Sequence, residues 1–389
     1  MTHSLDFLQT AQSPLLRGVD IALVRDLFDR KELQTPFMFL SRSEVRRNYT
    51  TLAEALPGVA LHYAVKSNNH HAILDELQQA GGRFEICSSR EIDAVLRVGA
   101  DPRTLVHSHP IKSCAEFDAA IAKGVETFVV DNVDEIHKLE RYSDRTLKLL
   151  VRYRINNNSK AVVDLQYKYG CAVDEVLPLA EQIRRTGHRF WGLSFHIGSQ
   201  CVYPQNYVKA IRSAGELIKA LATAGFETGL LDIGGGFPVE YVEPVPSIHE
   251  FCAPIVRALR RHVPDTVRII AEPGRFISAS PVTLVCSVIG KSVREGKVWY
   301  YLDDGLYSTF SGILYDHCQY PVITNQGGPS RLSVLAGPTC DSFDVMYDGL
   351  MIPDHVIGDP MVFPLTGAYC AVSGSDFNSL RRPDYVVVD

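Results

Sequence analysis

Several features of membrane, nucleic-acid-binding and disulfide-rich proteins are missing from this sequence. It has no run of 18 apolar residues, which argues against a membrane-spanning helix. It has no Lys/Arg-rich run and a net charge of −6, which argue against a nucleic-acid binder. The nine cysteines form no CxxC pair and no zinc-ligand spacing. We therefore expect reduced thiols, no disulfide framework and no metal site.

The N-terminal segment also lacks the pattern of a secretory signal. Residues 1–13 contain no basic stretch followed by an apolar one, so we expect a cytoplasmic protein. The chain has 389 residues, of which 46% are hydrophobic and 22% charged. These values are ordinary for a globular protein with two or three domains and a sizeable core.

Apolar, strand-like segments alternate with helix-like segments through most of the chain. The predicted strands cover residues 61–65, 83–87, 104–108, 127–131, 147–153, 191–197, 229–235 and 267–273. The helix-like segments between them are clearest at residues 72–80, 89–98, 114–123, 133–142, 173–185, 206–224 and 247–260. Eight such alternations predict a (β/α)8 TIM-type barrel over residues 36–280, and a doubly wound parallel sheet is the rival interpretation.

After about residue 280 the helix-like pattern fades. Short strand candidates take over, with Gly and Pro between them, at residues 282–289, 298–302, 322–324, 331–336, 356–357 and 361–363. This pattern predicts a C-terminal antiparallel β-barrel domain over residues 281–389. Residues 1–35 are a candidate addition to that domain.

A lysine stands at the end of the first predicted strand. Lys66 follows the apolar segment 61–65 and precedes small polar residues. Most lysines are solvated surface charges. In a partly desolvated site, however, the pKa of a lysine can fall until the amine forms a Schiff base with a carbonyl cofactor.

Other polar residues stand near the ends of the later predicted strands, where the active sites of (β/α)8 barrels are built. They are Glu85, Arg152, His196, Ser199, Gly234, Gly235, Gly236, Glu272 and Arg275. Each has a purely structural interpretation, such as a core histidine, a flexible turn or an ion pair. Together they suggest a phosphate approached by bare glycine N–H groups and by Arg275, and a pyridine nitrogen kept protonated by Glu272.

The sequence resembles the fold-type III, pyridoxal-phosphate-dependent amino-acid decarboxylases, and most of all their ornithine/lysine branch. The resemblance runs from about residue 36 to residue 378 and rests on motifs that recur in order. Those in the predicted barrel are Tyr63-Ala64-Val65-Lys66, Ser194-Phe195-His196-Ile197-Gly198-Ser199, Asp232-Ile233-Gly234-Gly235-Gly236-Phe237-Pro238 and Ala271-Glu272-Pro273-Gly274-Arg275. Those in the C-terminal part are Asp304-Gly305-Leu306-Tyr307, Ile313-Leu314-Tyr315-Asp316-His317, Gly337-Pro338-Thr339-Cys340-Asp341 and Gly367-Ala368-Tyr369.

The resemblance implies pyridoxal phosphate as cofactor and assigns residues to it. Lys66 would form the Schiff base, His196 would stack on the ring, and Glu272 would pair with the pyridine nitrogen. The phosphate would be held by Ser199, Gly234, Gly235, Gly236, Arg275 and Tyr369, with Gly274, Arg152 and Glu85 among the other residues at the cofactor. Position 85 departs from the pattern, because the eukaryotic ornithine enzymes usually have aspartate there.

The resemblance also implies a homodimer with shared active sites. Cys340 and Asp341 would come from the partner chain, and Cys340 would protonate Cα after CO2 leaves. The distal ammonium of the substrate would lie between Asp316 and Asp341. Tyr307, Tyr315 and Phe377 would complete the substrate site.

Two other interpretations stay open. One is decarboxylation of a related diamino acid, such as diaminopimelate, carboxynorspermidine or a secondary-pathway substrate. The diaminopimelate enzymes usually show Cys-Glu-Ser-Gly-Asp where this chain has Cys340-Asp341-Ser342-Phe343-Asp344. The other is a non-catalytic binding homologue. Retention of Lys66, Glu272, Arg275 and Cys340 argues against it, and the sequence does not rank ornithine against lysine.

Overall fold

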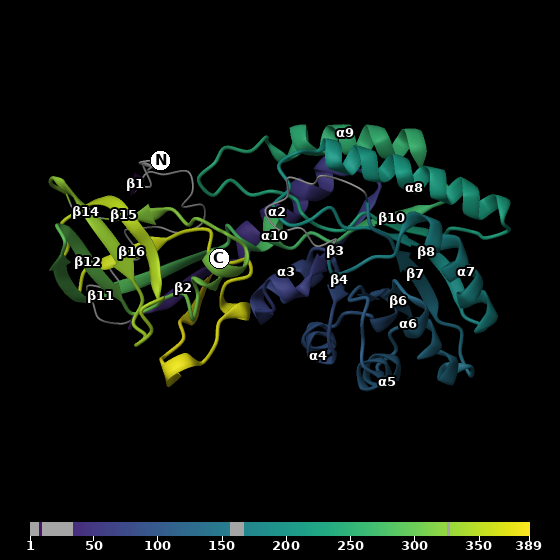
Figure 1. Cartoon of the computed structure of the whole chain (residues 1–389), viewed down its shortest axis with the longest axis horizontal. Helices are drawn as coiled ribbons and strands as arrows, with labels where there is room; N and C mark the ends of the chain where they lie inside the picture. The colour runs from purple at the N-terminus through teal and green to yellow at the C-terminus, as the bar shows by residue number, and fades with distance from the viewer. Residues whose placement is uncertain (1–7, 10–33, 156–166, 325–326) are drawn as a thin grey trace. The chain divides into compact units, whose positions relative to one another are not determined.

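A computed structural model describes residues 8–9, 34–155, 167–324 and 327–389 (Figure 1). They divide into two compact units. The barrel unit comprises Arg46–Pro238 and Val245–Phe276, and the β unit comprises the described parts of Met1–Val45, Val239–Pro244 and Ile277–Asp389. The predicted domain boundaries at residues 36 and 281 stay a prediction. The suggestion that residues 1–35 join the β domain falls mostly on residues 1–7 and 10–33, which lie outside the described residues.

The barrel unit contains a closed barrel of eight parallel strands. They are β3 (Val59–Ala64), β4 (Arg83–Ile86), β5 (Val106–His107), β6 (Thr127–Val130), β7 (Lys148–Arg152), β8 (Arg189–Ser194), β9 (Leu230–Asp232) and β10 (Arg268–Ala271). Strand β10 pairs with both β9 and β3, which closes the ring. The predicted (β/α)8 barrel is therefore confirmed, and the doubly wound sheet is excluded because such a sheet has two open edges.

One helix precedes the first barrel strand, and a helix follows each strand around the barrel (Figure 1). They are α2 (Arg42–Ala55), α3 (His71–Gln79), α4 (Ser89–Arg97), α5 (Cys114–Ala122), α6 (Val133–His137), α7 (Val176–Arg185), α8 (Gln205–Thr223), α9 (Ile248–His262) and α10 (Arg275–Ser278). Local sequence sets where several begin: the side chains of Ser88, Ser113 and Asn132 accept hydrogen bonds from the first turns of α4, α5 and α6.

Inside the barrel, five buried apolar side chains pack together in one layer. Val106, Val129, Leu150, Leu230 and Ile270 are all buried and pack together. This layer explains why the strands are short apolar runs, since both faces of a parallel barrel strand are covered. No helix among the described residues is long and apolar enough to cross a membrane.

The β unit is built on a nine-stranded sheet among the described residues. Its strands are β1 (Leu8–Gln9), β2 (Phe37–Ser41), β11 (Val282–Arg294), β12 (Lys297–Leu302), β13 (Val322–Ile323), β14 (Ser330–Ala336), β15 (Val345–Pro353), β16 (Pro360–Phe363) and β17 (Asp384–Val388). The long strand β11 pairs with β2, β12 and β16. The predicted C-terminal β domain is confirmed, and the N-terminal strands β1 and β2 join it.

This sheet is mixed, whereas the sequence predicted an antiparallel one. The pairs β1–β13, β12–β14 and β2–β17 are parallel. The tight hairpin between β11 and β12 gives antiparallel pairing, as expected. In contrast, β12 and β14 are separated by residues 303–329, a connection long enough to return the chain to the same end of the sheet.

Candidate active site

Lys66 lies directly after β3, in the short helical turn Val65–Ser67. Its ammonium forms an ion pair with Glu85 on the neighbouring strand β4, and the sulfur of Cys87 lies 3.8 Å from it. The Lys66 side chain is 37% exposed, whereas that of Glu85 is completely buried. The lysine can therefore be reached from the mouth of the barrel while its counter-ion stays fixed in the interior.

Glu85 is held by three donors. Besides Lys66, the hydroxyl of Ser108 and the thiol of Cys87 both donate to its Oε1, the thiol at 3.0 Å. Burial alone raises the pKa of Glu85, but the charge of Lys66 and these hydrogen bonds together lower it. Glu85 thus stays ionised and stabilises the charged form of Lys66. Ser108 and Cys87 were not identified from the sequence, because they belong to no motif.

Glu272 directly follows β10 and lies next to a second carboxyl group. Burial, followed by the charges of Asp232 and Glu85, raises the pKa of Glu272 well above its usual value. Burial also raises the pKa of Asp232 to about 6, although Gly234 N–H and the Ser194 hydroxyl donate to it at 2.9 and 2.8 Å. Oε1 of Glu272 is buried and has no hydrogen-bond partner. A buried acceptor of this kind requires a donor, and a protonated pyridine nitrogen would supply one.

The strand ends that carry Lys66 and Glu272 are directly linked. The N–H of Ala64, two residues before the lysine, donates to the carbonyl of Pro273 at 3.1 Å. Strands β3 and β10 are also paired along their length. The two residues therefore stand on adjacent strands at the carboxyl-terminal end of the barrel, where (β/α)8 enzymes carry out their chemistry.

Three consecutive glycines follow β9, and none could carry a side chain. A Cβ atom would lie 2.5 Å from the Phe195 carbonyl oxygen at Gly234, 2.4 Å from that of Glu272 at Gly235, and 2.2 Å from that of Gly198 at Gly236. Gly234 and Gly236 also have φ values of +68° and +110°, which favour glycine. The segment is packed against the ends of β8 and β10 as bare backbone, which is the form needed to approach a phosphate.

His196 and the pair Ser199–Arg275 lie beside this glycine segment. The N–H of Gly198 donates to Nδ1 of His196 at 3.0 Å, which places the ring proton of a neutral imidazole on Nε2. Burial, with the charges of Arg152 and Lys66, keeps the pKa of His196 well below its usual value. The Arg275 guanidinium donates to the hydroxyl of Ser199 at 3.1 Å. This pair brings a cation and a hydroxyl together as phosphate ligands.

Arg152 ends β7 and is oriented by an aromatic side chain. Its guanidinium lies 5.4 Å from the ring centre of Tyr169. The Tyr169 hydroxyl in turn lies 3.1 Å from Nε2 of His109, which follows β5. Tyr169 and His109 were not identified from the sequence, because they lie in loops that no pattern connects.

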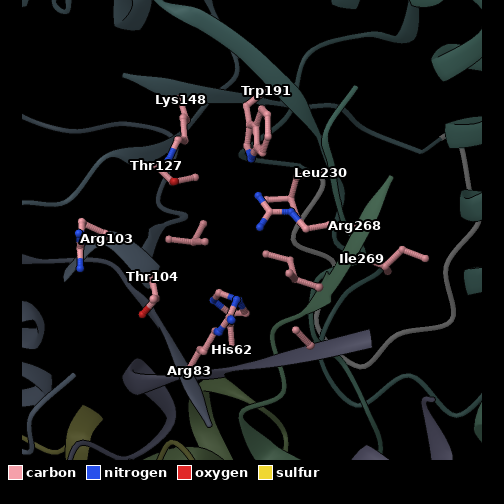
Figure 2. A pocket seen from close by; sticks show the side chains of 13 residues that line it. His62, Arg83, Arg103, Thr104, Thr127, Lys148, Trp191, Leu230, Arg268 and Ile269 are labelled. Atoms are coloured by element: carbon pink, nitrogen blue, oxygen red, sulfur yellow. The ribbon is translucent and has the colours of Figure 1, made fainter. Parts of the chain in front are cut away.

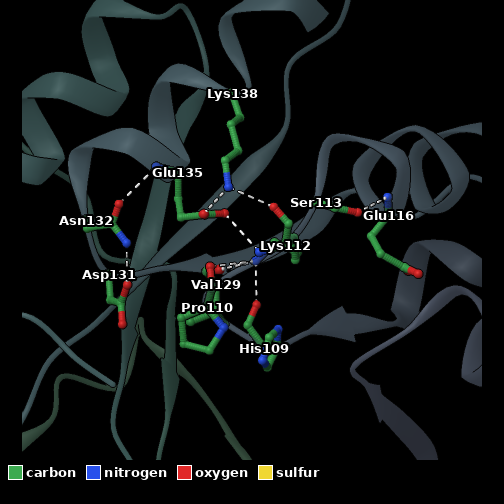
Figure 3. Close-up of polar contacts among 10 residues, drawn as sticks. All are labelled: His109, Pro110, Lys112, Ser113, Glu116, Val129, Asp131, Asn132, Glu135 and Lys138. Atoms are coloured by element: carbon green, nitrogen blue, oxygen red, sulfur yellow. Dashed lines mark hydrogen bonds and ion pairs between the residues drawn. The ribbon is translucent and has the colours of Figure 1, made fainter. Parts of the chain in front are cut away.

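The loop that carries Ser108 and His109 is fixed by a buried lysine (Figure 3). Lys112 is 3% exposed, and its ammonium donates to the carbonyls of His109, Pro110 and Val129 at 2.5, 3.1 and 2.7 Å. Burial lowers the pKa of Lys112 to about 7, although the carboxylate of Glu135 acts in the opposite direction. One side chain thus satisfies three carbonyls and positions the loop beside Glu85.

We expect Lys112→Met to lower the free energy of unfolding by about 2–4 kcal/mol, because buried carbonyl groups lose their donors. Urea unfolding followed by circular dichroism would measure this loss. Lys209→Met is a matched control, since Lys209 is exposed on α8 and should change stability by less than about 0.5 kcal/mol. Equal stabilities of the two variants would contradict the role given to Lys112.

In the β unit, three of the predicted substrate residues lie together. The ring of Tyr307 stacks on Phe377, with ring centres 4.5 Å apart and an interplanar angle of 28°. The Tyr307 hydroxyl donates to the carboxylate of Asp341. This bond, with the N–H of Phe343, lowers the pKa of Asp341, so the group is ionised and suits an ammonium ligand.

The remaining predicted residues of the β unit occupy separate positions. Cys340 is exposed, and its N–H donates to the side-chain oxygen of Asn378 at 3.1 Å. Tyr315 ends the short helix α11 (Ser311–Tyr315) and is 66% exposed, with the half-buried Asp316 next to it. Tyr369 has a φ of +55°, an unusual conformation for a non-glycine residue that is often found at functional sites.

Asp344 organises the two loops that carry Tyr307 and Asp341. It is 2% exposed and accepts hydrogen bonds from the N–H of Leu306 at 2.7 Å and from the N–H and hydroxyl of Thr339 at 3.1 and 2.7 Å. No spacing rule marks such a carboxylate. The sequence therefore identified the residues on these loops but not the residue that holds them.

Comparisons with known proteins point to one family. Residues 42–279 match the family model described as "Pyridoxal-dependent decarboxylase, pyridoxal binding domain". The chain is 35% identical to the lysine/ornithine decarboxylase of Selenomonas ruminantium, over 92% of this chain and 91% of that protein. It is 31% identical to the ornithine decarboxylase of Rattus norvegicus, over 94% and 84%. The structure of a lysine/ornithine decarboxylase from Vibrio vulnificus, complexed with putrescine, superposes with a TM-score of 0.89 at 38% identity, covering 95% of this chain and 98% of that one.

Proposed function

The chain belongs to the pyridoxal-dependent decarboxylases, and we propose that within this family it converts a basic L-amino acid, ornithine or lysine, into a diamine and CO2 for polyamine synthesis. The observation that supports this most is that the accessible Lys66 and the buried Glu272, whose Oε1 has no donor, lie at the ends of adjacent strands. The names of the relatives, together with the putrescine in the Vibrio vulnificus structure, support the substrate class. Release of CO2 from ornithine or lysine by the purified chain tests the proposal.

Pyridoxal phosphate, when bound, supplies an electron sink for the electron pair that remains at Cα after CO2 leaves. Lys66 would hold its aldehyde carbon, and the glycine segment with Ser199 and Arg275 would hold its phosphate. Gly274, Arg152 and, from the β unit, Tyr369 are proposed to complete the phosphate and ring contacts. When the amine of Lys66 is not attached to the cofactor, Glu85 would keep it protonated and in place.

Glu272 is proposed to hold the proton on the pyridine nitrogen. Burial and the neighbouring carboxylates Asp232 and Glu85 raise the pKa of Glu272 well above its usual value, which favours the protonated form before any ligand enters. That proton can move to a nitrogen placed against Oε1, leaving a buried carboxylate with a cationic partner. Asp232, hydrogen-bonded to Gly234 N–H, orients Glu272 and adds negative charge nearby.

His196 and Cys340 are proposed to have different roles. His196 has a pKa kept well below its usual value by burial, so its neutral ring suits stacking on a flat aromatic group better than proton transfer. Cys340 is exposed and therefore accessible, and its thiol would deliver one proton to Cα after CO2 has left. A decarboxylase needs only one such donor, whereas a racemase needs an acid/base group on each face of Cα.

Substrate choice is proposed to depend on the carboxylates of the β unit. Asp341, kept ionised by Tyr307, would bind the distal ammonium together with Asp316. Phe377, stacked on Tyr307, would line the methylene chain, with Tyr315 near it. Ornithine and lysine differ by one methylene, which is typically worth only about 1–3 kcal/mol in a pocket, so one site could accept both.

We further propose a cytoplasmic homodimer in which Cys340 and Asp341 of one chain serve the barrel of the other. Exposed apolar side chains near Cys340 support an interface there, since Phe343 is 61% exposed and Phe377, which precedes the Asn378 that Cys340 hydrogen-bonds, is 40% exposed. All nine cysteines are free, which fits a reducing compartment. A closed two-fold dimer would complete both sites equally.

Mixing two inactive chains tests this arrangement. If sites are shared, a mixed dimer of Lys66→Ala and Cys340→Ala chains has one site with both changes and one with neither. Random exchange makes about half of the dimers mixed, so we expect about a quarter of wild-type activity to return. As a control, mixing Lys66→Ala with Glu272→Gln should restore nothing, because both residues belong to the same barrel. No recovery in the first mixture, once subunit exchange is demonstrated, would contradict shared sites.

A further inference from the structure

A hollow lies in the barrel unit, at the end opposite the candidate active site. It is lined by residues at the N-terminal ends of the barrel strands and has a volume of about 220 Å³ (Figure 2). The apolar layer inside the barrel separates the two ends, since Val106, Leu230 and Ile270 belong to that layer and also line the hollow. A ligand in the hollow would therefore not touch the candidate catalytic residues.

The charge of this hollow is of one sign. Among its lining residues in the described part of the chain, Arg83, Arg103, Lys148 and Arg268 are basic and none is an aspartate or glutamate. Two of these cations are already paired outside the hollow, Arg103 with Asp101 and Lys148 with a nearby glutamate. The concentration of positive charge over a concave surface favours an anion.

The other two cations, Arg83 and Arg268, have no carboxylate within ion-pair distance among the described residues. The Arg268 guanidinium lies 5.2 Å from the ring centre of Trp191, which orients it. Figure 2 shows this guanidinium pointing toward the middle of the ring of lining side chains, with His62 beside Arg83. Two unpaired guanidinium groups on β4 and β10 thus line one space.

His62 provides an independent indication of a ligand. It is 3% exposed and lines the hollow, and its ring nitrogens form no hydrogen bond of normal geometry, although the backbone of Phe84 lies close enough to act on its pKa. Burial, with the charge of Arg83, lowers the pKa of His62 to about 4, so the ring is neutral at pH 7 and carries one N–H. A buried ring N–H whose protein partner is poorly aligned can donate to an acceptor in the adjoining space.

We propose that the N-terminal mouth of the barrel binds a phosphate-group dianion, held by Arg83 and Arg268 with the N–H of His62 as a third donor. Guanidinium groups bind phosphate oxygens through paired hydrogen bonds, and two of them match two negative charges. The hollow is about seven times the ~30 Å³ that one water molecule occupies in the liquid. It therefore has room for free phosphate or for the phosphate group of a small ester.

Calorimetric titration of the pyridoxal-phosphate-loaded enzyme tests this site. Inorganic phosphate and adenosine monophosphate are titrated separately at constant ionic strength, with chloride as the reference anion. We expect one saturable site that is about tenfold or more weaker in Arg83→Gln or Arg268→Gln, because each removes a charge-assisted donor. Arg141→Gln is the matched control, since Arg141 is exposed and paired with Asp118 away from the hollow.

Comparing the two ligands shows whether the site prefers free phosphate or the phosphate group of an ester. Tighter binding of adenosine monophosphate supports an ester as ligand, and equal or weaker binding supports free phosphate. Both arginines are exposed, so their variants should fold, and unchanged thermal unfolding without phosphate would verify this. Absence of saturable binding to the wild-type enzyme, or equal affinity in wild type and both variants, would overturn the proposal.

Discussion

Lys66→Ala is expected to abolish covalent attachment of pyridoxal phosphate and nearly all turnover. In the wild-type protein, borohydride should fix the cofactor on Lys66, the accessible lysine whose ammonium is paired with the buried Glu85. Removing the amine removes both the attachment point and the group that must exchange with the substrate amine. We expect a loss of at least about 10³-fold in kcat, roughly 4 kcal/mol of barrier.

Peptide mapping of the reduced protein and steady-state kinetics would measure both effects. Lys123→Ala is a suitable control, because Lys123 is a partly exposed lysine paired with Asp93. It should keep full attachment and activity. A normal amount of cofactor attached to a different lysine in Lys66→Ala would show that the assignment is wrong.

Glu272→Gln is expected to leave the cofactor bound but to slow decarboxylation by about 10²- to 10³-fold, the usual effect of removing one strong electrostatic contact to the reacting group. Glutamine can still occupy the space and accept a hydrogen bond, but it cannot hold the pyridine nitrogen in its charged form. Single-turnover rates of CO2 release would measure the change. Glu76→Gln is the matched control, since Glu76 is a buried carboxylate on α3 that pairs with Arg46. An unchanged single-turnover rate in Glu272→Gln would contradict the role.

Glu272→Gln should also change how the stability of the cofactor-free protein depends on pH. The pKa of Glu272 is raised well above 4.5, so the folded chain keeps a proton that the unfolded chain releases. The free energy of unfolding of the cofactor-free protein therefore falls as the pH rises above that value. Glutamine does not titrate, so the cofactor-free variant should lose less stability between about pH 5 and 8 than wild type. A steeper loss in the variant would contradict the raised pKa.

The sequence allowed the barrel to be predicted because its strands are short apolar runs between amphipathic helices. The strand-end residues could be anticipated for the same reason: once β3 and β10 were placed, Lys66 and Glu272 had to lie at the same end of the barrel. The glycine segment after β9 was equally informative, because only glycine fits where three carbonyls from the two neighbouring segments after β8 and β10 approach so closely.

Other features depend on contacts between distant segments. The parallel pairing of β12 with β14 follows from the path of a long connection, which periodicity does not describe. Ser108 and Asp344 lie in loops, and their roles arise only because Glu85 and Leu306 are brought beside them. The buried Lys112 reads in the sequence as an ordinary surface lysine, whereas in the structure it joins three carbonyls.

We propose that this chain decarboxylates ornithine or lysine with pyridoxal phosphate. The most direct measurement supplies the purified chain with the cofactor and follows CO2 release and amine products from ornithine, lysine, arginine and diaminopimelate in parallel. We predict release from ornithine, lysine or both, with putrescine or cadaverine as product, and little from the other two, because an ionised Asp341 favours a distal ammonium. Release from diaminopimelate alone, or from none of the four although the cofactor is bound, would contradict the account.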